Sequence, residues 1–236
     1  MTNDSNGNRI LAAIPSETFQ ALRVEQADYP LGAKLYTPDE TPAHAYFPHF
    51  GAVISIVRST ENGTMVESGV IGDEGLCSVQ TVIADPQPTG GVAVVQSAGK
   101  LSRVDLRRLR EHFRTDPPLR DAILTFTSAF LNHVTQNLVC NRLHEIEQRL
   151  AKWLLVVRDR TGRDELSLTQ EFLSHMLGVH RPGVSIAVGA LAADGLIAQG
   201  RNRIRIRDAE GLEKRSCECY GVLRQSLEQL RAAVVA

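Results

Sequence analysis

Four arginines occupy alternate positions near the end of the chain, namely Arg201, Arg203, Arg205 and Arg207. In an extended strand alternate residues point to the same face, so these guanidinium groups would form one positive stripe opposite Ile204 and Ile206. Arginine pairs well with phosphate, so the stripe suits a nucleic-acid backbone. Taken alone, the stripe is also compatible with an ordinary solvated strand face.

The segment before the stripe has the pattern of two short helices joined by a tight turn. Thr169 can cap the first helix, Gly178 allows the turn, and Pro182 suits the start of the second helix. A helix-turn-helix followed by a two-stranded ribbon is the winged form, whose second helix fits the major groove of DNA.

The side chains expected to contact DNA come from both helices and the ribbon: Thr169, Gln170, His180, Arg181, Ser185, Ile186, Arg201, Arg203 and Arg205. Arg181 can pair with guanine through two hydrogen bonds, and Ser185 can donate to a base or a phosphate. We therefore expect base readout from the second helix and phosphate contacts from the ribbon.

Cysteine and histidine side chains indicate no catalytic or metal site. Cys217 and Cys219 are interpreted as two thiols on the last helix, because a metal would need two further ligands that the sequence does not identify. His44 and His49 have an odd spacing, so on a strand they would point to opposite faces, unlike the paired histidines of a cupin-type metal enzyme. No phosphate-binding loop, nucleophile elbow or dinucleotide fingerprint occurs. We predict no enzyme activity, no metal and no cofactor.

The elements that position these residues fall into three regions, predicted as 10–115, 116–142 and 143–236. In the first region one or two short helices precede short apolar runs from Leu31 onward, including a run over 75–83. Asn62-Gly63 is a strong hairpin signal between two such runs. Seven or so short strands predict a small antiparallel sandwich or barrel, and the helices that follow make the chain α+β.

The middle region predicts one long helix that starts at Asp116-Pro117-Pro118. Its apolar positions near a heptad spacing are Leu124, Leu131, Val134 and Leu138. We expect these residues to form a seam with the same helix of a second subunit. The alternative is that they pack onto the protein's own sheet. Asn141-Arg142 is a plausible hinge to the next helix, a polar loop follows at 161–165, and residues 212–235 predict a last helix.

Composition and charge are those of a globular protein with an uneven charge distribution. The chain has 236 residues, of which 43% are hydrophobic, and a formal net charge of −1. Residues 1–141 hold 11 Lys and Arg against 15 Asp and Glu, whereas residues 142–236 hold 15 against 12. The N-terminus is polar and no apolar run could span a membrane, so we expect a cytoplasmic protein with no membrane partner.

The whole chain resembles the Crp–Fnr family of bacterial transcription regulators, which are similar to the cyclic-AMP receptor protein. The most specific stretch is 168–197 with the ribbon to Asp208, and 72–75 resembles the glycine-acid turn of the family's effector cassette. The resemblance implies a cyclic-nucleotide-binding-like antiparallel β-roll, a dimerisation helix and a winged helix-turn-helix. It also implies a homodimer that binds double-stranded DNA at a roughly palindromic operator and contacts RNA polymerase.

The resemblance further implies an effector pocket, with the candidate residues Gly72, Asp73, Glu74 and Thr89. Asp73 and Glu74 can also be simple turn residues. Family members that bind cyclic AMP hold its phosphate with an arginine, but no basic residue occurs here between Thr81 and Ala98. We therefore predict that cyclic AMP is not bound and that the effector of the β-roll is either an unknown small molecule or has been lost. Oxygen-sensing members need several N-terminal cysteines, and only Cys77 precedes residue 140, so that cluster is not supported.

The second helix departs from the family pattern at its start. It reads Arg181-Pro182-Gly183, and the last two residues offer no side-chain hydrogen bond for a base. Base preference therefore cannot be transferred from the family. A second hypothesis follows, in which the chain is a small-molecule sensor or interaction module of the same fold that has lost DNA readout.

Overall fold

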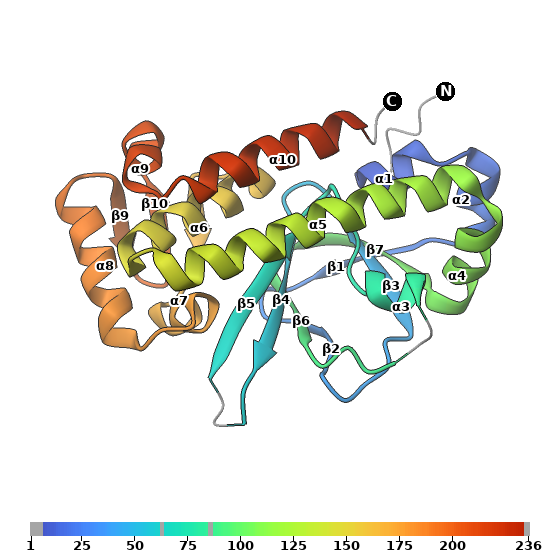
Figure 1. Ribbon diagram of the computed structural model, residues 1–236, viewed down its shortest axis with the longest axis horizontal. Helices are drawn as coiled ribbons and strands as arrows, with labels where there is room; N and C mark the ends of the chain where they lie inside the picture. Colours follow the sequence, from blue (N-terminus) through green and yellow to red (C-terminus); the bar gives the residue numbers. More distant parts are fainter. Residues whose placement is uncertain (1–6, 62–63, 85–86, 234–236) are drawn as a thin grey trace.

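The computed structural model describes residues 7–61, 64–84 and 87–233. A β-rich domain and a mainly helical domain lie at opposite ends of the molecule, and one long helix, α5 (Pro117–Leu143), runs between them (Figure 1). The fold is α+β, with the order of elements that the sequence predicts.

Within the described residues, seven strands build the β-rich domain as two antiparallel sheets. The strands are β1 (Glu25–Tyr29), β2 (Lys34–Tyr36), β3 (His44–Pro48), β4 (Val53–Ser59), β5 (Met65–Ile71), β6 (Val92–Ser97) and β7 (Gly99–Asp105). One sheet has the order β1-β7-β3 and the other the order β2-β6-β4-β5. Phe47 and Leu101 from the first sheet and Ile54 and Val95 from the second share one buried core. Burial of these apolar faces holds the sheets together as a β-roll.

Four short helices flank the sheets, namely α1 (Arg9–Ala13), α2 (Ser16–Leu22), α3 (Val79–Ile83) and α4 (Leu106–Thr115). Two details differ from the sequence prediction. The segment 79–83 is a helix and not the end of a strand, since Ser78 turns the chain with a left-handed φ of 71°. β1 was not predicted because most of its residues are polar and exposed, as at a sheet edge.

The hairpin between β4 and β5 has the predicted antiparallel pairing, with Ser59 opposite Met65. Asn62-Gly63, the predicted turn, lies outside the described residues. On the far side of β4, Val92 of β6 pairs with Val57, so β4 is a central strand of its sheet.

Helix α5 has two apolar faces with different surroundings. Ile123 and Phe126 are fully buried against the β-roll core. Leu124, Leu131 and Leu138 are 44%, 61% and 66% exposed, so they do not pack onto the protein's own sheet. Within one chain these leucines are therefore largely uncovered, although Leu131 also lines a cavity against the β-roll, and the seam with a second subunit stays a prediction. Val134 is half-buried.

The predicted hinge is three residues away from the actual break. Helix α5 ends at Leu143, and α6 (Ile146–Thr161) begins after His144 and Glu145. A capping box fixes this new start, because the Glu145 side chain accepts from the backbone of Gln148 while the Gln148 side chain accepts from the Glu145 backbone.

The helical domain continues with β8 (Glu165–Ser167), α7 (Gln170–Leu177), α8 (Arg181–Ala193), β9 (Ile197–Gly200), β10 (Arg203–Ile206), α9 (Ala209–Arg215) and α10 (Cys219–Ala233). The order β8-β10-β9 makes a three-stranded wing, in which β8 occupies part of the predicted polar loop. Residues 212–235 were predicted as one helix, but the chain breaks at 216–218 between α9 and α10. No single helix in the described ranges is long and apolar enough to cross a membrane, and α7 with α8 meets that test only as a pair bent by 107°.

Helix α10 runs back along α5 toward the β-roll (Figure 1). Leu230 joins the β-roll core, and the Arg231 guanidinium lies 2.7 Å from a carboxylate oxygen of Asp73. The other carboxylate oxygen of Asp73 lies 3.0 Å from Arg9 of α1. Helix α10 of the helical domain is therefore linked to α1 through one buried carboxylate.

A buried polar group joins the β-roll to α6. Glu67 of β5 accepts hydrogen bonds from Ser55 Oγ at 2.7 Å and from Trp153 Nε1 at 3.0 Å. Burial raises the pKa of this carboxyl to about 7, although these two bonds and the charges of Lys152 and Arg160 oppose that rise. The folded protein therefore holds a proton on Glu67 at pH values where the unfolded chain has released it.

This difference predicts that the stability of the protein falls as the pH rises from about 4.5 to about 7, since the folded pKa lies above the unfolded one. Glu67→Gln should remove that loss, so the variant should be more stable than the parent by roughly 2–3 kcal/mol at pH 8 and equally stable near pH 4.5. Urea unfolding of both proteins across this pH range measures the effect. Parallel stability curves for the two proteins would contradict it.

Candidate nucleic-acid interface

Local hydrogen bonds define the two helices of the helix-turn-helix. The Thr169 side chain caps α7 by accepting from the backbone N–H of Phe172 at 3.0 Å. Helix α7 ends at Gly178, whose φ of 62° is left-handed and therefore favours glycine. Helix α8 begins at Arg181, with Pro182 in its first turn as predicted, and lies at 107° to α7.

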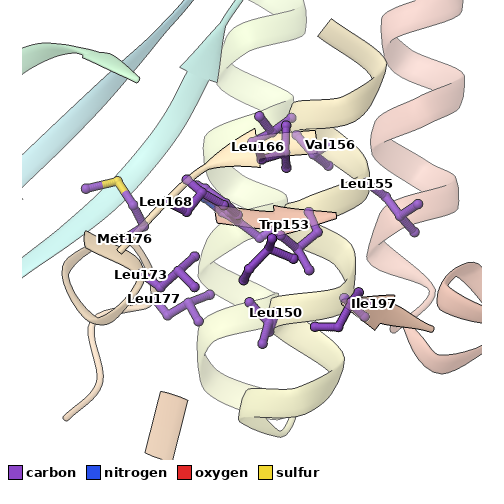
Figure 2. Close-up of a cluster of buried hydrophobic side chains, with 14 of the residues drawn as sticks. Leu150, Trp153, Leu155, Val156, Leu166, Leu168, Leu173, Met176, Leu177 and Ile197 are labelled. Carbon is purple, nitrogen blue, oxygen red and sulfur yellow. The ribbon is translucent and has the colours of Figure 1, made fainter. Parts of the chain in front are cut away.

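An apolar core holds α7 and α8 against α6 and the wing (Figure 2). Leu173 and Leu177 of α7 point toward Leu150 and Trp153 of α6, with Ile197 of β9 on the far side of α6. Four apolar residues of α8 are buried: Val184, Ala187, Val188 and Leu191. This packing leaves the opposite side of α8 turned outward.

The predicted base-reading residues of α8 lie on that outward side. His180, Arg181 and Ser185 are exposed, and Ile186 is 73% exposed. The Ser185 hydroxyl donates to Oε1 of Gln170 at 2.7 Å. This bond links the starts of the two helices and holds Gln170 beside the outward face of α8.

The Arg181 guanidinium is paired within the chain. Its Nη2 lies 2.5 Å from a carboxylate oxygen of Glu171, and both side chains are more than half exposed. Pairs with this exposure contribute little to stability, so the contact can open at low cost. Glu171 thus holds the guanidinium at the start of α8 while leaving it available to another acceptor.

The wing presents Arg203 and Arg205 as the alternation predicts, whereas Arg201 and Arg207 lie just outside β10. Ile204 and Ile206 are buried, whereas Arg203 and Arg205 are exposed and lie 3.5 Å and 3.1 Å from Glu165 of β8. Arg201 lies in the exposed turn before β10. A hollow of about 470 Å³ separates the wing from the helix-turn-helix, and its lining includes Thr169, Gln170, Glu171, Arg181, Arg201, Asn202 and Arg203. Residues predicted to contact DNA, some from the helix-turn-helix and some from the ribbon, therefore line one concave surface.

A second cavity, of about 390 Å³, lies between the β-roll and α5. Thr89 lines it, as do Tyr36 of β2 and Phe130 and Leu131 of α5. Most of its surface is apolar. Among the described residues that line the cavity, Arg58 of β4 is the one charged side chain, and it is exposed.

The other three effector candidates do not line this cavity. Asp73 is paired with Arg9 and Arg231, and Glu74 lies buried 2.8 Å from Arg160 of α6. The Glu74 carboxylate also accepts from the Gly72 backbone N–H. Asp73 and Glu74 therefore fit the interpretation as turn residues and not as pocket residues, because arginines from other elements neutralise their charges.

The sequence did not point to several residues at these sites. Arg58 supplies the cavity with a cation from β4, a strand outside 81–98, the segment in which no basic residue occurs. Glu165 and Glu171 form ion pairs with arginines that are predicted to contact DNA. These pairs depend on tertiary contacts, so the sequence does not show them. Among the described residues, one group of four side chains could hold a metal ion: Cys140, His144, Cys217 and Cys219.

Comparisons with known proteins agree with this geometry. Residues 148–215 match the Crp-like helix-turn-helix domain. A curated relative, the CRP-like cAMP-activated global transcriptional regulator of Mycobacterium tuberculosis, is 24% identical over 201 residues, which cover 82% of this chain and 89% of the relative.

Solved structures share the fold over most of the chain. A transcriptional regulator of the crp/fnr family from Eubacterium rectale aligns with a TM-score of 0.70 at 14% identity, covering 89% of this chain and 98% of that one. FixK2 from Bradyrhizobium japonicum aligns with a TM-score of 0.68 at 18% identity, covering 82% and 98%. The c-di-GMP responsive regulator CLP from Xanthomonas campestris gives 0.67 at 16%, covering 81% and 99%.

A cyclic-nucleotide-binding-like β-roll joined to a Crp-like winged helix-turn-helix defines a class, the DNA-binding transcription regulators. Within that class the chain is similar to regulators of the Crp–Fnr family over most of its length, and its residues 148–215 match the Crp-like helix-turn-helix domain. This family consists of regulators and not of enzymes.

Proposed function

We propose that the protein acts as a homodimer that reads a roughly palindromic DNA operator, with α8 of each subunit in successive major grooves. The observation that carries this proposal is the exposed side of α8, with His180, Arg181 and Ser185 beside the arginine-bearing wing. Half-sites for two such helices would lie about 34 Å apart, near one turn of DNA. A regulator of this kind would contact RNA polymerase in the cytoplasm, as the family implies.

The exposed face of α5 supports the dimer. Leu124, Leu131 and Leu138 repeat every seven residues and stay exposed, which is costly for a monomer in water. A second copy of the same helix would bury them in a two-stranded seam, with Val134 on the intermediate turn. The helix has 27 residues and so spans about 40 Å, enough for several heptads.

The two groups of arginines would do different work on DNA. Arg181 would leave Glu171 and pair with a guanine edge in the major groove, which gives sequence preference. Arg201, Arg203 and Arg205 would contact phosphates from the wing, which gives affinity without sequence preference. Thr169 and Gln170 lie at the start of α7, where a backbone phosphate would approach.

Arg181→Ala should therefore lose roughly 1–3 kcal/mol of binding to a preferred duplex and relax discrimination at one base pair. Binding to shuffled DNA should change little. Arg203→Ala should weaken both duplexes alike and reduce the salt dependence of binding, so it serves as the matched control. The measurement is fluorescence anisotropy on a duplex that the parent protein enriches from a random pool. If Arg181→Ala retains the parent's affinity and discrimination, the assignment of α8 as the reading helix is wrong.

Leu138→Glu should convert the dimer to monomers, because it would place two like charges in the seam. Leu138 is preferred over Leu131 for this test because Leu131 also lines the β-roll cavity. Asn132→Glu, on an exposed position beside the seam, is the control and should remain dimeric. Sedimentation velocity reports both states. An unchanged dimer for Leu138→Glu would remove α5 as the dimer interface.

The cavity between the β-roll and α5 would bind the effector. Its apolar lining with one exposed cation suits a small, mostly apolar molecule with a single anionic group. Cyclic AMP is not expected to bind, since 87–91 offers no cation for its phosphate and Arg58, the cation that another strand supplies, has an exposed side chain. We therefore expect millimolar cyclic AMP to leave the melting temperature unchanged. A clear rise in that temperature, abolished by Arg58→Ala, would contradict this expectation.

The second hypothesis, a sensor or interaction module without DNA readout, draws on the start of α8. Pro182 is exposed and offers no donor, and Gly183 packs where an added Cβ would lie 3.0 Å from Ile146. Weak binding that is equal for all duplexes, with a steep salt dependence, would favour this hypothesis over the first.

A further inference from the structure

Three thiols and one imidazole converge where α5 ends and α10 begins. Cys140 lies in the last turn of α5, and His144 is the residue that caps that helix. Cys217 precedes α10, and Cys219 is its first residue. The donor atoms of all four side chains lie within 4.8 Å of one another, and the three cysteines are buried.

Two of the six distances between these donor atoms match the edges of a tetrahedron around one small ion, and all six are below 4.8 Å. Cys140 Sγ lies 3.6 Å from Cys217 Sγ, and Cys219 Sγ lies 3.5 Å from His144 Nδ1. Zinc bonds of about 2.3 Å to sulfur and 2.0 Å to nitrogen give tetrahedral edges of roughly 3.5–3.8 Å. From this geometry we propose that Cys140, His144, Cys217 and Cys219 bind one structural Zn²⁺ ion. A multi-iron cluster would hold its cysteine sulfurs farther apart, because several metal atoms would lie between them.

The neighbouring side chains orient the ligands as a metal site requires. His144 turns Nδ1 toward the sulfurs, while its Nε2 lies 3.2 Å from a carboxylate oxygen of Glu218. That contact keeps the proton on Nε2 and leaves the lone pair of Nδ1 free for the metal. Gln136 Nε2 donates to Cys219 Sγ at 3.0 Å, a bond that a metal-bound thiolate accepts well. The role of Glu218, between the two cysteines of 217–219, is thereby explained.

Nearby cations suit the charge of the bound site. Three thiols lose their protons to solvent when the metal binds, so three thiolates with Zn²⁺ and a neutral imidazole carry a net charge of −1. Lys152 and Arg149 are two buried cations of α6, the helix that follows His144. Lys152 is buried and held by Asn137 Oδ1 at 2.9 Å. These side chains compensate the excess negative charge inside the protein.

The site lies where the helical domain, which begins with α6, connects to the end of α5. His144 stands at the break between α5 and α6, and Cys217 and Cys219 begin the helix that returns along α5. A metal ion here would fasten α10 to the end of α5 and so fix the angle at which α6 leaves the dimerisation helix. Its occupancy does not depend on DNA binding.

Metal analysis of the full chain, purified under reducing conditions without an affinity tag that binds metal, tests the proposal. We expect one zinc per chain by mass spectrometry, and replacement by Co²⁺ should give the visible absorption of tetrahedral cobalt with thiolate charge-transfer bands. His144→Ala and Cys219→Ser should lose the zinc. Cys77→Ser is the matched control, because Cys77 is a buried thiol of the β-roll core and should not affect zinc content.

Glu218→Gln provides a test that does not risk folding, since the Glu218 side chain is 75% exposed. It should retain the metal but lower zinc affinity 10–100-fold in a chelator competition. Absence of zinc together with no cobalt spectrum in the folded parent would overturn the proposal. So would iron in place of zinc, a Cys140–Cys217 disulfide in the reduced preparation, or full zinc retention in Cys219→Ser.

Discussion

The structure depends on one constraint, which is that helix α5 has two apolar faces that both have to be buried. Ile123 and Phe126 bury one face of α5 in the core of the β-roll, which fixes the helix to that domain. The leucines of the other face remain exposed, and a second copy of the helix would cover them. A helix constrained in this way fixes the positions of both domains, and in a dimer it would also fix the distance between two copies of α8.

The two domains meet at one pair of strands, β4 and β5. Ile56 and Arg58 of β4 line the β-roll cavity, while Val57 and Glu67 face α6 and contact the core around Trp153. An added Cβ at Gly178, in the turn of the helix-turn-helix, would lie 2.9 Å from Val66 of β5, so that turn rests against the same hairpin. A ligand in the cavity would therefore press on one side of the strands whose other side supports the DNA-proximal domain. Helix α10 adds a second connection, from the end of α5 to Asp73.

Local patterns were sufficient to predict most of the fold. Alternating apolar runs predicted the β-roll, and the Thr169 cap, Gly178 and Pro182 predicted the ends of α7 and α8. Alternation also predicted that Arg203 and Arg205 would lie opposite Ile204 and Ile206. Each of these signals is encoded within about ten residues, so tertiary structure was not needed to interpret it.

Features that depend on long-range contacts could not be predicted. The proposed metal ligands come from segments 77 residues apart, and only the antiparallel return of α10 along α5 brings Cys140 to Cys217. Asp73 and Glu74 were assigned to a pocket because nothing in their neighbourhood shows that arginines from α1, α6 and α10 pair with them. The Arg58 cation was missed for the same reason, because it reaches the cavity from another strand.

In the proposed dimer, α5 holds the α8 helices of the two subunits at a fixed separation along DNA. Inserting about five base pairs, half a helical turn, between the two halves of an enriched duplex tests it directly. We expect a large loss of affinity, because one α8 would then face the wrong side of the DNA. Insertion of about ten base pairs, a full helical turn, should restore part of the affinity. Equal affinity for all three spacings would contradict this fixed separation, since each subunit would then bind DNA independently of the other.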